Sequence, residues 1–88
     1  MARFEVRITV TVEIEIADAV LARHQDGPWA AHFYGLNTPE LIAEHLAYNL
    51  AIKGRDLSDL DGFADRTDNE ARVINVEYDY DDTRRVGR

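Results

Sequence analysis

The chain contains no cysteine, which excludes disulfide bridges and thiolate metal sites. Its only serine, Ser58, lies between acidic residues and outside any Gly-x-Ser-x-Gly elbow, and the five glycines are too scattered to form a phosphate-binding loop. No apolar run approaches the roughly 18 residues of a membrane span. Because charged residues interrupt the apolar positions from Arg3 onward, we also expect no secretory signal. These absences, and a composition that fits a reducing compartment, predict a cytoplasmic protein.

Acidic residues are concentrated in one part of the sequence. Ten acidic and three basic residues lie between Gly54 and Asp82, so this segment accounts for the whole net charge of −7. A surface of this sign repels phosphates, which argues against direct nucleic-acid binding.

The most informative positive feature is an unbroken alternation of apolar and polar residues over 3–16. Phe4 and every second residue up to Ile16 lie on one face. The other face carries only polar residues: Arg3, Glu5, Arg7, Thr9, Thr11, Glu13 and Glu15. A period of two over this length predicts one long strand with one buried and one wet face. Its length also predicts strong twist, a bulge, or extension beyond its partner.

Residues 39–53 have the best helix signals in the chain. Thr38 is a good N-cap, Pro39 suits the first helical position, and Gly54 is a natural stop after Lys53. The segment between them has a broad, mostly apolar stripe. Shorter helical segments are predicted over 17–24 and 28–34, and Leu57, Leu60 and Phe63 recur at a spacing typical of a helical turn pinned to the core.

A second strand is predicted over 71–80, with Ile74, Val76, Tyr78 and Tyr80 on its apolar face. Antiparallel pairing places Arg3 and Arg7 near Glu77 and Asp79, whereas parallel pairing opposes like charges. Opposite charges across a ladder stabilise it, so we expect the antiparallel arrangement.

Together these elements predict an α+β fold, with two long strands packed against two or three helices. We expect a single domain over 1–82 and a polar, flexible tail over 83–88. A strand as long as 3–16 leaves an edge that proteins usually cover. A symmetric homodimer, in which strand 3–16 forms the contact, is therefore one functional hypothesis: a structural or assembly component.

Catalytic and metal-binding signals are weak. Segment 57–68 partly matches an EF-hand calcium loop, but Leu57 replaces the first acidic ligand and Asp68 the bidentate glutamate. His24, His32 and His45 match no zinc spacing, and Glu44 and His45, as helix neighbours, point about 100° apart. We therefore expect the chain to be no enzyme and to bind no cofactor or metal. A small metal-dependent or acid/base enzyme is kept only as the third hypothesis.

The leading hypothesis is a non-enzymatic, acidic protein-interaction module with a regulatory or inhibitory role. Clustered carboxylates imitate the phosphate track of DNA and attract nucleic-acid-binding grooves on other proteins. The aromatic residues, Trp29 included, are candidates for the core, but Trp29 follows a Gly-Pro turn and is alternatively a candidate interface anchor. The predicted partner-binding residues are Asp56, Asp59, Asp61, Asp65, Asp68 and Trp29.

Two stretches, ARFEVRITVTVEIEI at the start and NLAIKGRDLSDLDGFADR in the second half, resemble small acidic uncharacterised proteins of actinobacterial phages and their hosts. The resemblance covers about half of the chain and implies no known activity or catalytic residue. It favours a phage-encoded protein that modulates a host protein in the host cytoplasm.

Overall fold

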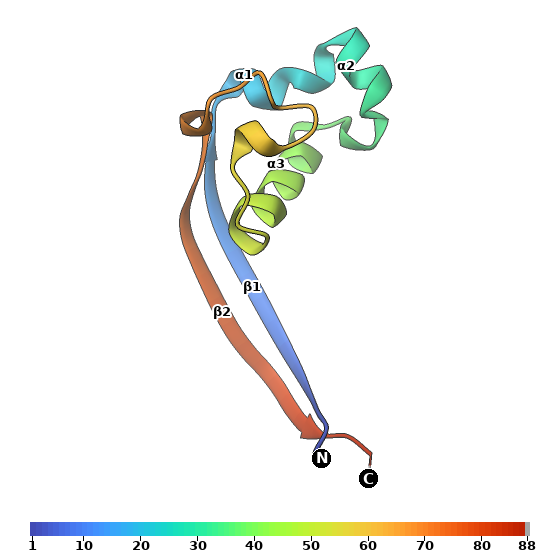
Figure 1. Cartoon of the computed structure of the whole chain (residues 1–88), viewed down its shortest axis with the longest axis vertical. Helices are drawn as coiled ribbons and strands as arrows, with labels where there is room; N and C mark the ends of the chain where they lie inside the picture. Colours follow the sequence, from blue (N-terminus) through green and yellow to red (C-terminus); the bar gives the residue numbers. More distant parts are fainter. Residues whose placement is uncertain (88) are drawn as a thin grey trace.

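The computed structural model describes residues 1–87, which form a long two-stranded ribbon and a helical lobe (Figure 1). The ribbon consists of β1 (Phe4–Ile16) and β2 (Ala71–Arg85). The lobe contains α1 (Asp18–Leu21), η1 (Ala22–Gln25), α2 (Gly27–His32), η2 (Tyr34–Leu36), α3 (Pro39–Ala47), η3 (Tyr48–Ile52), η4 (Leu57–Asp59) and η5 (Asp68–Glu70). The α+β prediction is therefore confirmed.

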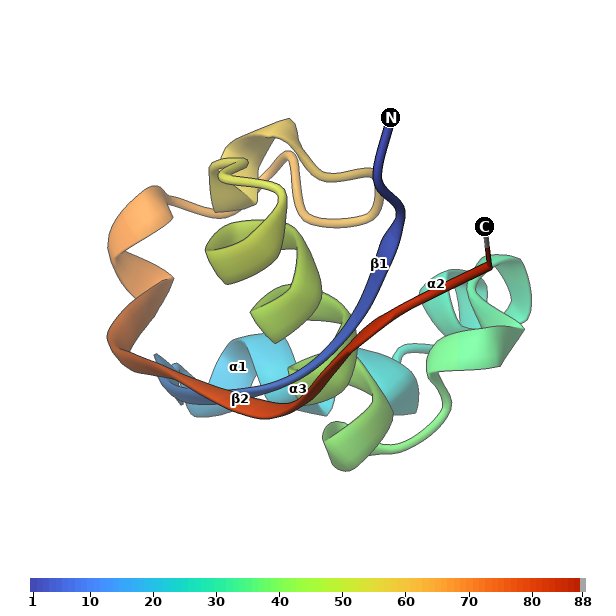
Figure 2. The ribbon, with the colours of Figure 1, turned by 90° about the horizontal axis from the view of Figure 1, so that it is seen from below.

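The ribbon is much longer than the lobe that covers it. The described residues span 53 × 26 × 20 Å, and the lobe lies at one end of the long axis. Figure 2, viewed along that axis, shows the curved ribbon crossing α3, with α1 on the inner side of the curve and α2 beyond β2. We call residues 4–10 of β1 and 78–85 of β2 the distal arm, because they extend away from the lobe.

The two strands pair antiparallel, as the charge pattern predicts. Arg84 lies 3.0 Å from Glu5 at one end of the ladder, and Arg72 lies 3.0 Å from Glu15 at the other. The individual pairs differ from those expected, since Arg7 lies opposite Asp82 and not opposite Glu77 or Asp79.

The reason for this difference is that β2 is longer than predicted. It continues to Arg85, five residues beyond the expected end at residue 80 and into the segment predicted as a tail. Thr83 pairs with Val6 and Arg85 with Phe4, and the Arg85 guanidinium lies 5.2 Å from the centre of the Phe4 ring. This extra ladder and the Glu5–Arg84 ion pair explain why the polar sequence after residue 80 forms a strand.

Two irregularities interrupt the ladder, one between Arg7 and Ile8 and the other between Glu13 and Ile14. Each leaves one β2 residue without a partner, Asp81 in the first case and Ile74 in the second. Such bulges bend a ribbon and increase its twist. The second one corrects the predicted apolar face, because Val73 lies opposite Ile14 while Ile74 remains 48% exposed.

The predicted helix over 39–53 is confirmed, with a change of type near its end. The Thr38 side chain accepts a hydrogen bond from the Leu41 N–H (3.1 Å), which caps α3. From Tyr48 the helix widens into the π-helical turn η3, where the Lys53 N–H donates to the carbonyl of residue 48, five positions earlier. Gly54 follows with φ +66°, the left-handed conformation that stops a helix.

A small core joins the lobe to the near end of the ribbon. The predicted turn residues Leu57, Leu60 and Phe63 are all buried in it. The other buried members are Val20, Trp29, Ile42, Leu46 and Ala71. From β1, only Ile14 and Ile16 are packed against this core.

Two leucines of α3 test the contribution of this core. Leu46 is fully buried and Leu41 is 36% exposed, so the same substitution in the same helix differs mainly in burial. We expect Leu46→Ala to lower the free energy of unfolding by about 2–5 kcal/mol and Leu41→Ala by less than about 1 kcal/mol. Urea denaturation followed by the fluorescence of the single tryptophan measures both, and equal losses would contradict this core assignment.

Candidate protein-interaction site

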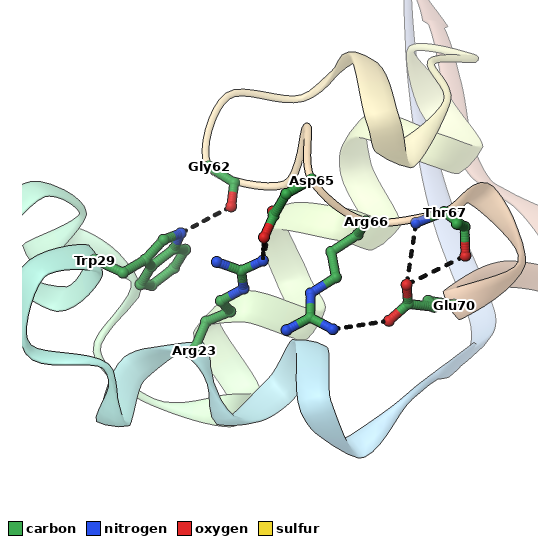
Figure 3. A network of polar contacts seen from close by, with 7 residues as sticks. All are labelled: Arg23, Trp29, Gly62, Asp65, Arg66, Thr67 and Glu70. Carbon is green, nitrogen blue, oxygen red and sulfur yellow. Dashed lines mark hydrogen bonds and ion pairs between the residues drawn. The ribbon is translucent and has the colours of Figure 1, made fainter.

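The structure divides the five aspartates predicted to form an electrostatic face into two groups. Asp65 and Asp68 have partners within the chain. Asp65 accepts hydrogen bonds from the Arg23 guanidinium, whose side chain is only 11% exposed (Figure 3). Asp68 accepts a hydrogen bond from the Ser58 N–H at 2.9 Å and so ties η5 to η4.

A second group of contacts holds the start of β2 in place. Thr67 and Glu70 form a capping box around η5, and the Glu70 carboxylate accepts a further hydrogen bond from Arg66 at 3.2 Å (Figure 3). The Ala17 N–H donates to the Glu70 carbonyl at 2.7 Å, which links this turn to the end of β1. Much of the acidity therefore organises the loop before β2.

These contacts shift carboxyl pKa values in one direction. The hydrogen bond from Arg23 lowers the pKa of Asp65, and the backbone N–H of Ser58 lowers that of Asp68, both from an ordinary value of 3.8. The backbone N–H of Thr67 lowers the pKa of Glu70 from 4.5. All three groups are ionised in the folded chain at neutral pH.

The lowered pKa values predict acid sensitivity. A group whose folded pKa lies below its unfolded pKa stabilises the fold above the unfolded value, and this stabilisation disappears as the pH falls through the folded value. We therefore expect the melting temperature to fall as the pH drops below about 4.5. Asp68→Asn should flatten this fall relative to Asp59→Asn, a matched change at an exposed aspartate, in thermal melts at several pH values.

All five aspartates are exposed, but within residues 1–87 the side chains of the other three, Asp56, Asp59 and Asp61, have no hydrogen bond of the kind that engages Asp65 and Asp68. Asp56 precedes η4, Asp59 is its last residue and Asp61 follows it, next to the buried Leu57 and Leu60 that anchor this turn. The acidic face available to a partner is thus smaller than the sequence predicts. We call these three residues the acidic turn.

Trp29 is not the exposed anchor that the sequence suggests. It is 8% exposed, and its indole N–H donates to the Gly62 carbonyl at 2.8 Å (Figure 3). Its ring lies 4.8 Å from that of Phe33 and 5.6 Å from that of Phe63, measured between ring centres. The Gly-Pro turn places Trp29 at the start of α2, where its side chain points into the core.

Gly62 allows this packing. Its φ is +91°, and a methyl group in place of its hydrogen would lie 2.8 Å from the Phe33 ring. Gly54 also has a positive φ, but nothing lies within 4 Å of the corresponding position. We expect Gly62→Ala to destabilise the chain by about 1–3 kcal/mol more than Gly54→Ala, because only the former adds a steric clash to the backbone strain. Chemical denaturation of both variants measures the difference. Equal losses of unfolding free energy would show that the Phe33 and Trp29 rings move aside at no measurable cost.

The histidines and the EF-hand-like segment form no metal centre within residues 1–87, where no group of three or more metal-ligating side chains comes together. Leu57, at the first position of that segment, is buried in the core. His45 stacks on Phe63 with the ring centres 6.4 Å apart, and burial lowers its pKa below 6.5.

A long uncovered apolar surface lies on the distal arm, which the sequence-based site prediction missed. Its side chains are between 37% (Val10) and 72% (Tyr80) exposed. The ladder places Val10 opposite Tyr78 and Ile8 opposite Tyr80, so they share one face. This apolar stripe consists of Phe4, Val6, Ile8, Val10, Tyr78 and Tyr80. It exposes on the order of 600 Å², the upper end of what monomeric proteins show.

Both strands of the distal arm carry charges of both signs. Glu5 and Arg7 alternate on β1, whereas β2 carries the acids Asp79, Asp81 and Asp82 followed by Arg84 and Arg85. Within residues 1–87 each strand has only one neighbour in the sheet, so the outer edge of each presents unpaired backbone groups. The arm therefore offers a partner an apolar face and a strand edge together.

Comparisons with protein-family models, with curated proteins and with solved structures give no match. The resemblance to phage proteins stays a prediction. No helix among residues 1–87 has the length and apolar character needed to cross a membrane.

Proposed function

We propose that the chain is a non-enzymatic protein-interaction module that binds its partner through the distal arm. The observation that supports this most directly is the apolar stripe, which continues along β1 from Val10 to Phe4 after the lobe has ended. Exposed apolar side chains lower the solubility of a free protein, and contiguous patches of this size mark binding sites.

The arm has the features of a surface that adds a strand from its partner. Main-chain hydrogen bonds to a free edge provide affinity, and alternate side chains provide specificity. Phe4, Tyr78 and Tyr80 supply aromatic area of the kind that dominates binding energy at interfaces. The lobe then acts as the folded base that holds the two strand ends in register, through Ala17 and Glu70.

The acidic turn supports a second candidate, a regulatory or inhibitory contact with a basic groove on a host protein. Asp56, Asp59 and Asp61 are exposed and close in sequence. Electrostatic attraction of this kind speeds association and weakens with salt. In both cases we place the module in the cytoplasm, because a cysteine-free chain fits a reducing compartment.

Affinity capture with two matched variants separates these candidates. Ile8→Glu with Tyr80→Lys removes two residues of the apolar stripe but keeps an opposite-charge pair across the ladder and the net charge. Asp59→Lys with Asp61→Lys reverses the acidic turn. Lysate from the cells that express the protein is passed over the parent and both variants, each checked for folding by circular dichroism.

We expect the arm variant to lose specific partners, including untagged copies of the chain, while the acidic-turn variant keeps them. If only the acidic-turn variant loses partners, and if the parent captures these partners more strongly at low salt, the second candidate is favoured. If the parent, the arm variant and the acidic-turn variant all capture the same proteins, both candidate functions are contradicted.

A further inference from the structure

We propose that the partner of the distal arm is a second copy of this chain, whose β1 pairs antiparallel with β1 around a two-fold axis at Val6. This inference rests on the proposed function and names its partner. The product is a four-stranded antiparallel sheet in the order β2-β1-β1-β2, with the two lobes at opposite ends.

The backbone of β1 favours such pairing. Within residues 1–87 β1 pairs with β2 alone, and the hydrogen bonds that flank the ladder, from the Val86 N–H to the Arg3 carbonyl and from the Ala17 N–H to the Glu70 carbonyl, also lie on the β2 side. A two-stranded ribbon is marginally stable by itself, and a sheet of three or more strands with an apolar face is much more stable. The distal arm, which lacks lobe contacts, gains most from added strands.

Charge complementarity narrows the register to an axis at Val6 or at Ile8, where Arg3 would lie opposite Glu13, and we place the axis at Val6 because its charge pairs lie directly beside the axis. With Val6 opposite Val6 of the second copy, Glu5 lies opposite Arg7 of the second copy and the reverse pair forms as well. Arg3 then lies opposite Thr9, so no like charges are opposed. Moving the axis by one residue places either Glu5 opposite Glu5 or Arg7 opposite Arg7, which destabilises the ladder.

The apolar stripe follows the same register. Phe4 lies opposite Ile8 of the second copy, and the two Val6 side chains meet at the axis. A two-fold axis normal to the sheet keeps both stripes on one face, so they form one wider apolar surface between the lobes.

The outer edge of β2 is less suited to self-pairing. An axis at Thr83 would oppose Asp82 to Arg84, but the bulged residue Asp81 lies within that ladder and interrupts its regular spacing. Pairing of β1 with β2 of a second copy is charge-compatible but heterologous, and leaves a free edge at each end for further addition. The closed arrangement is the β1-to-β1 dimer.

Sedimentation velocity of the parent and of two single variants tests the register. In Glu5→Arg and in Arg7→Glu, both symmetric charge pairs become repulsive, so each variant should dimerise at least about tenfold more weakly than the parent. When the two variants are mixed in equal amounts, they can form a heterodimer. In it the Glu5→Arg copy carries arginine at positions 5 and 7, and the Arg7→Glu copy carries glutamate at both of these positions. Each charge pair between the two copies is then attractive, so dimerisation should recover toward the parent level, although the Glu5→Arg copy still lacks its own Glu5–Arg84 ion pair. Native mass spectrometry identifies the heterodimer by mass.

Glu13→Arg is the matched control. It reverses the same type of charge on the same face of β1, but it lies outside the proposed ladder and should leave dimerisation unchanged. If Glu13→Arg weakens dimerisation and the changes at Glu5 and Arg7 do not, the proposed register is overturned. That result would place the axis at Ile8, where Glu13 lies opposite Arg3 of the second copy. Urea denaturation confirms that each variant is folded, and Glu5→Gln and Arg7→Gln replace any that is not.

The remaining outcomes also decide the question. A dimer that ignores all three charge reversals but is lost in Ile8→Glu with Tyr80→Lys would mean that two apolar faces pack together, which overturns edge pairing. Assemblies that grow beyond two copies would indicate β1-to-β2 addition and overturn the closed dimer. A parent that is monomeric over about a hundredfold range of concentration would overturn the second copy as partner. The proposed function would still stand if the arm variant loses other proteins in the capture experiment.

Discussion

The pairing of β1 with β2 is the constraint on which the rest of the structure depends. These strands are the two ends of the described chain, and Phe4 pairs with Arg85 across almost its whole length. Closing so long a loop costs conformational entropy, which the ladder and the lobe core must offset. The Glu15–Arg72 ion pair and the backbone hydrogen bond from the Ala17 N–H to the Glu70 carbonyl fix the ladder at the point where the chain enters and leaves the lobe. At the far end, the Glu5–Arg84 pair keeps the arm closed.

A mismatch of lengths then creates the candidate site. Thirteen residues of β1 extend for about 43 Å, whereas the nine residues of α3 and the five of η3 together extend for about 20 Å. A helix of this length covers Ile14 and Ile16 but has no reach toward Phe4 or Val6. The apolar face of the distal arm is uncovered for this geometric reason, and neither the bulges nor the acidic loop removes it.

Sequence patterns predicted the elements well and the site poorly. Period two identified both strands, the charges gave their orientation, and Thr38 with Gly54 bounded the long helix. The π-helical end, the two bulges and the last five residues of β2 have no local signal, because each depends on what lies opposite. Trp29 was misplaced because a Gly-Pro turn does not determine which way the next side chain points. The exposed arm was foreseeable in one respect, since strand 3–16 is too long for the helices to cover.

The distribution of charge explains why the acidic segment is a poor guide to the site. Asp65, Asp68 and Glu70 serve the fold, where each accepts hydrogen bonds that order the loop before β2. The acids of β2 have a different effect, because charged side chains and the bulge at Asp81 both discourage uncontrolled strand addition at that edge. The β1 edge has no bulged residue and alternates in sign around Val6. In the proposed dimer the two β1 edges cover each other and only the β2 edges remain, which limits further strand addition, while the apolar stripes stay together on one face as a surface for a further partner.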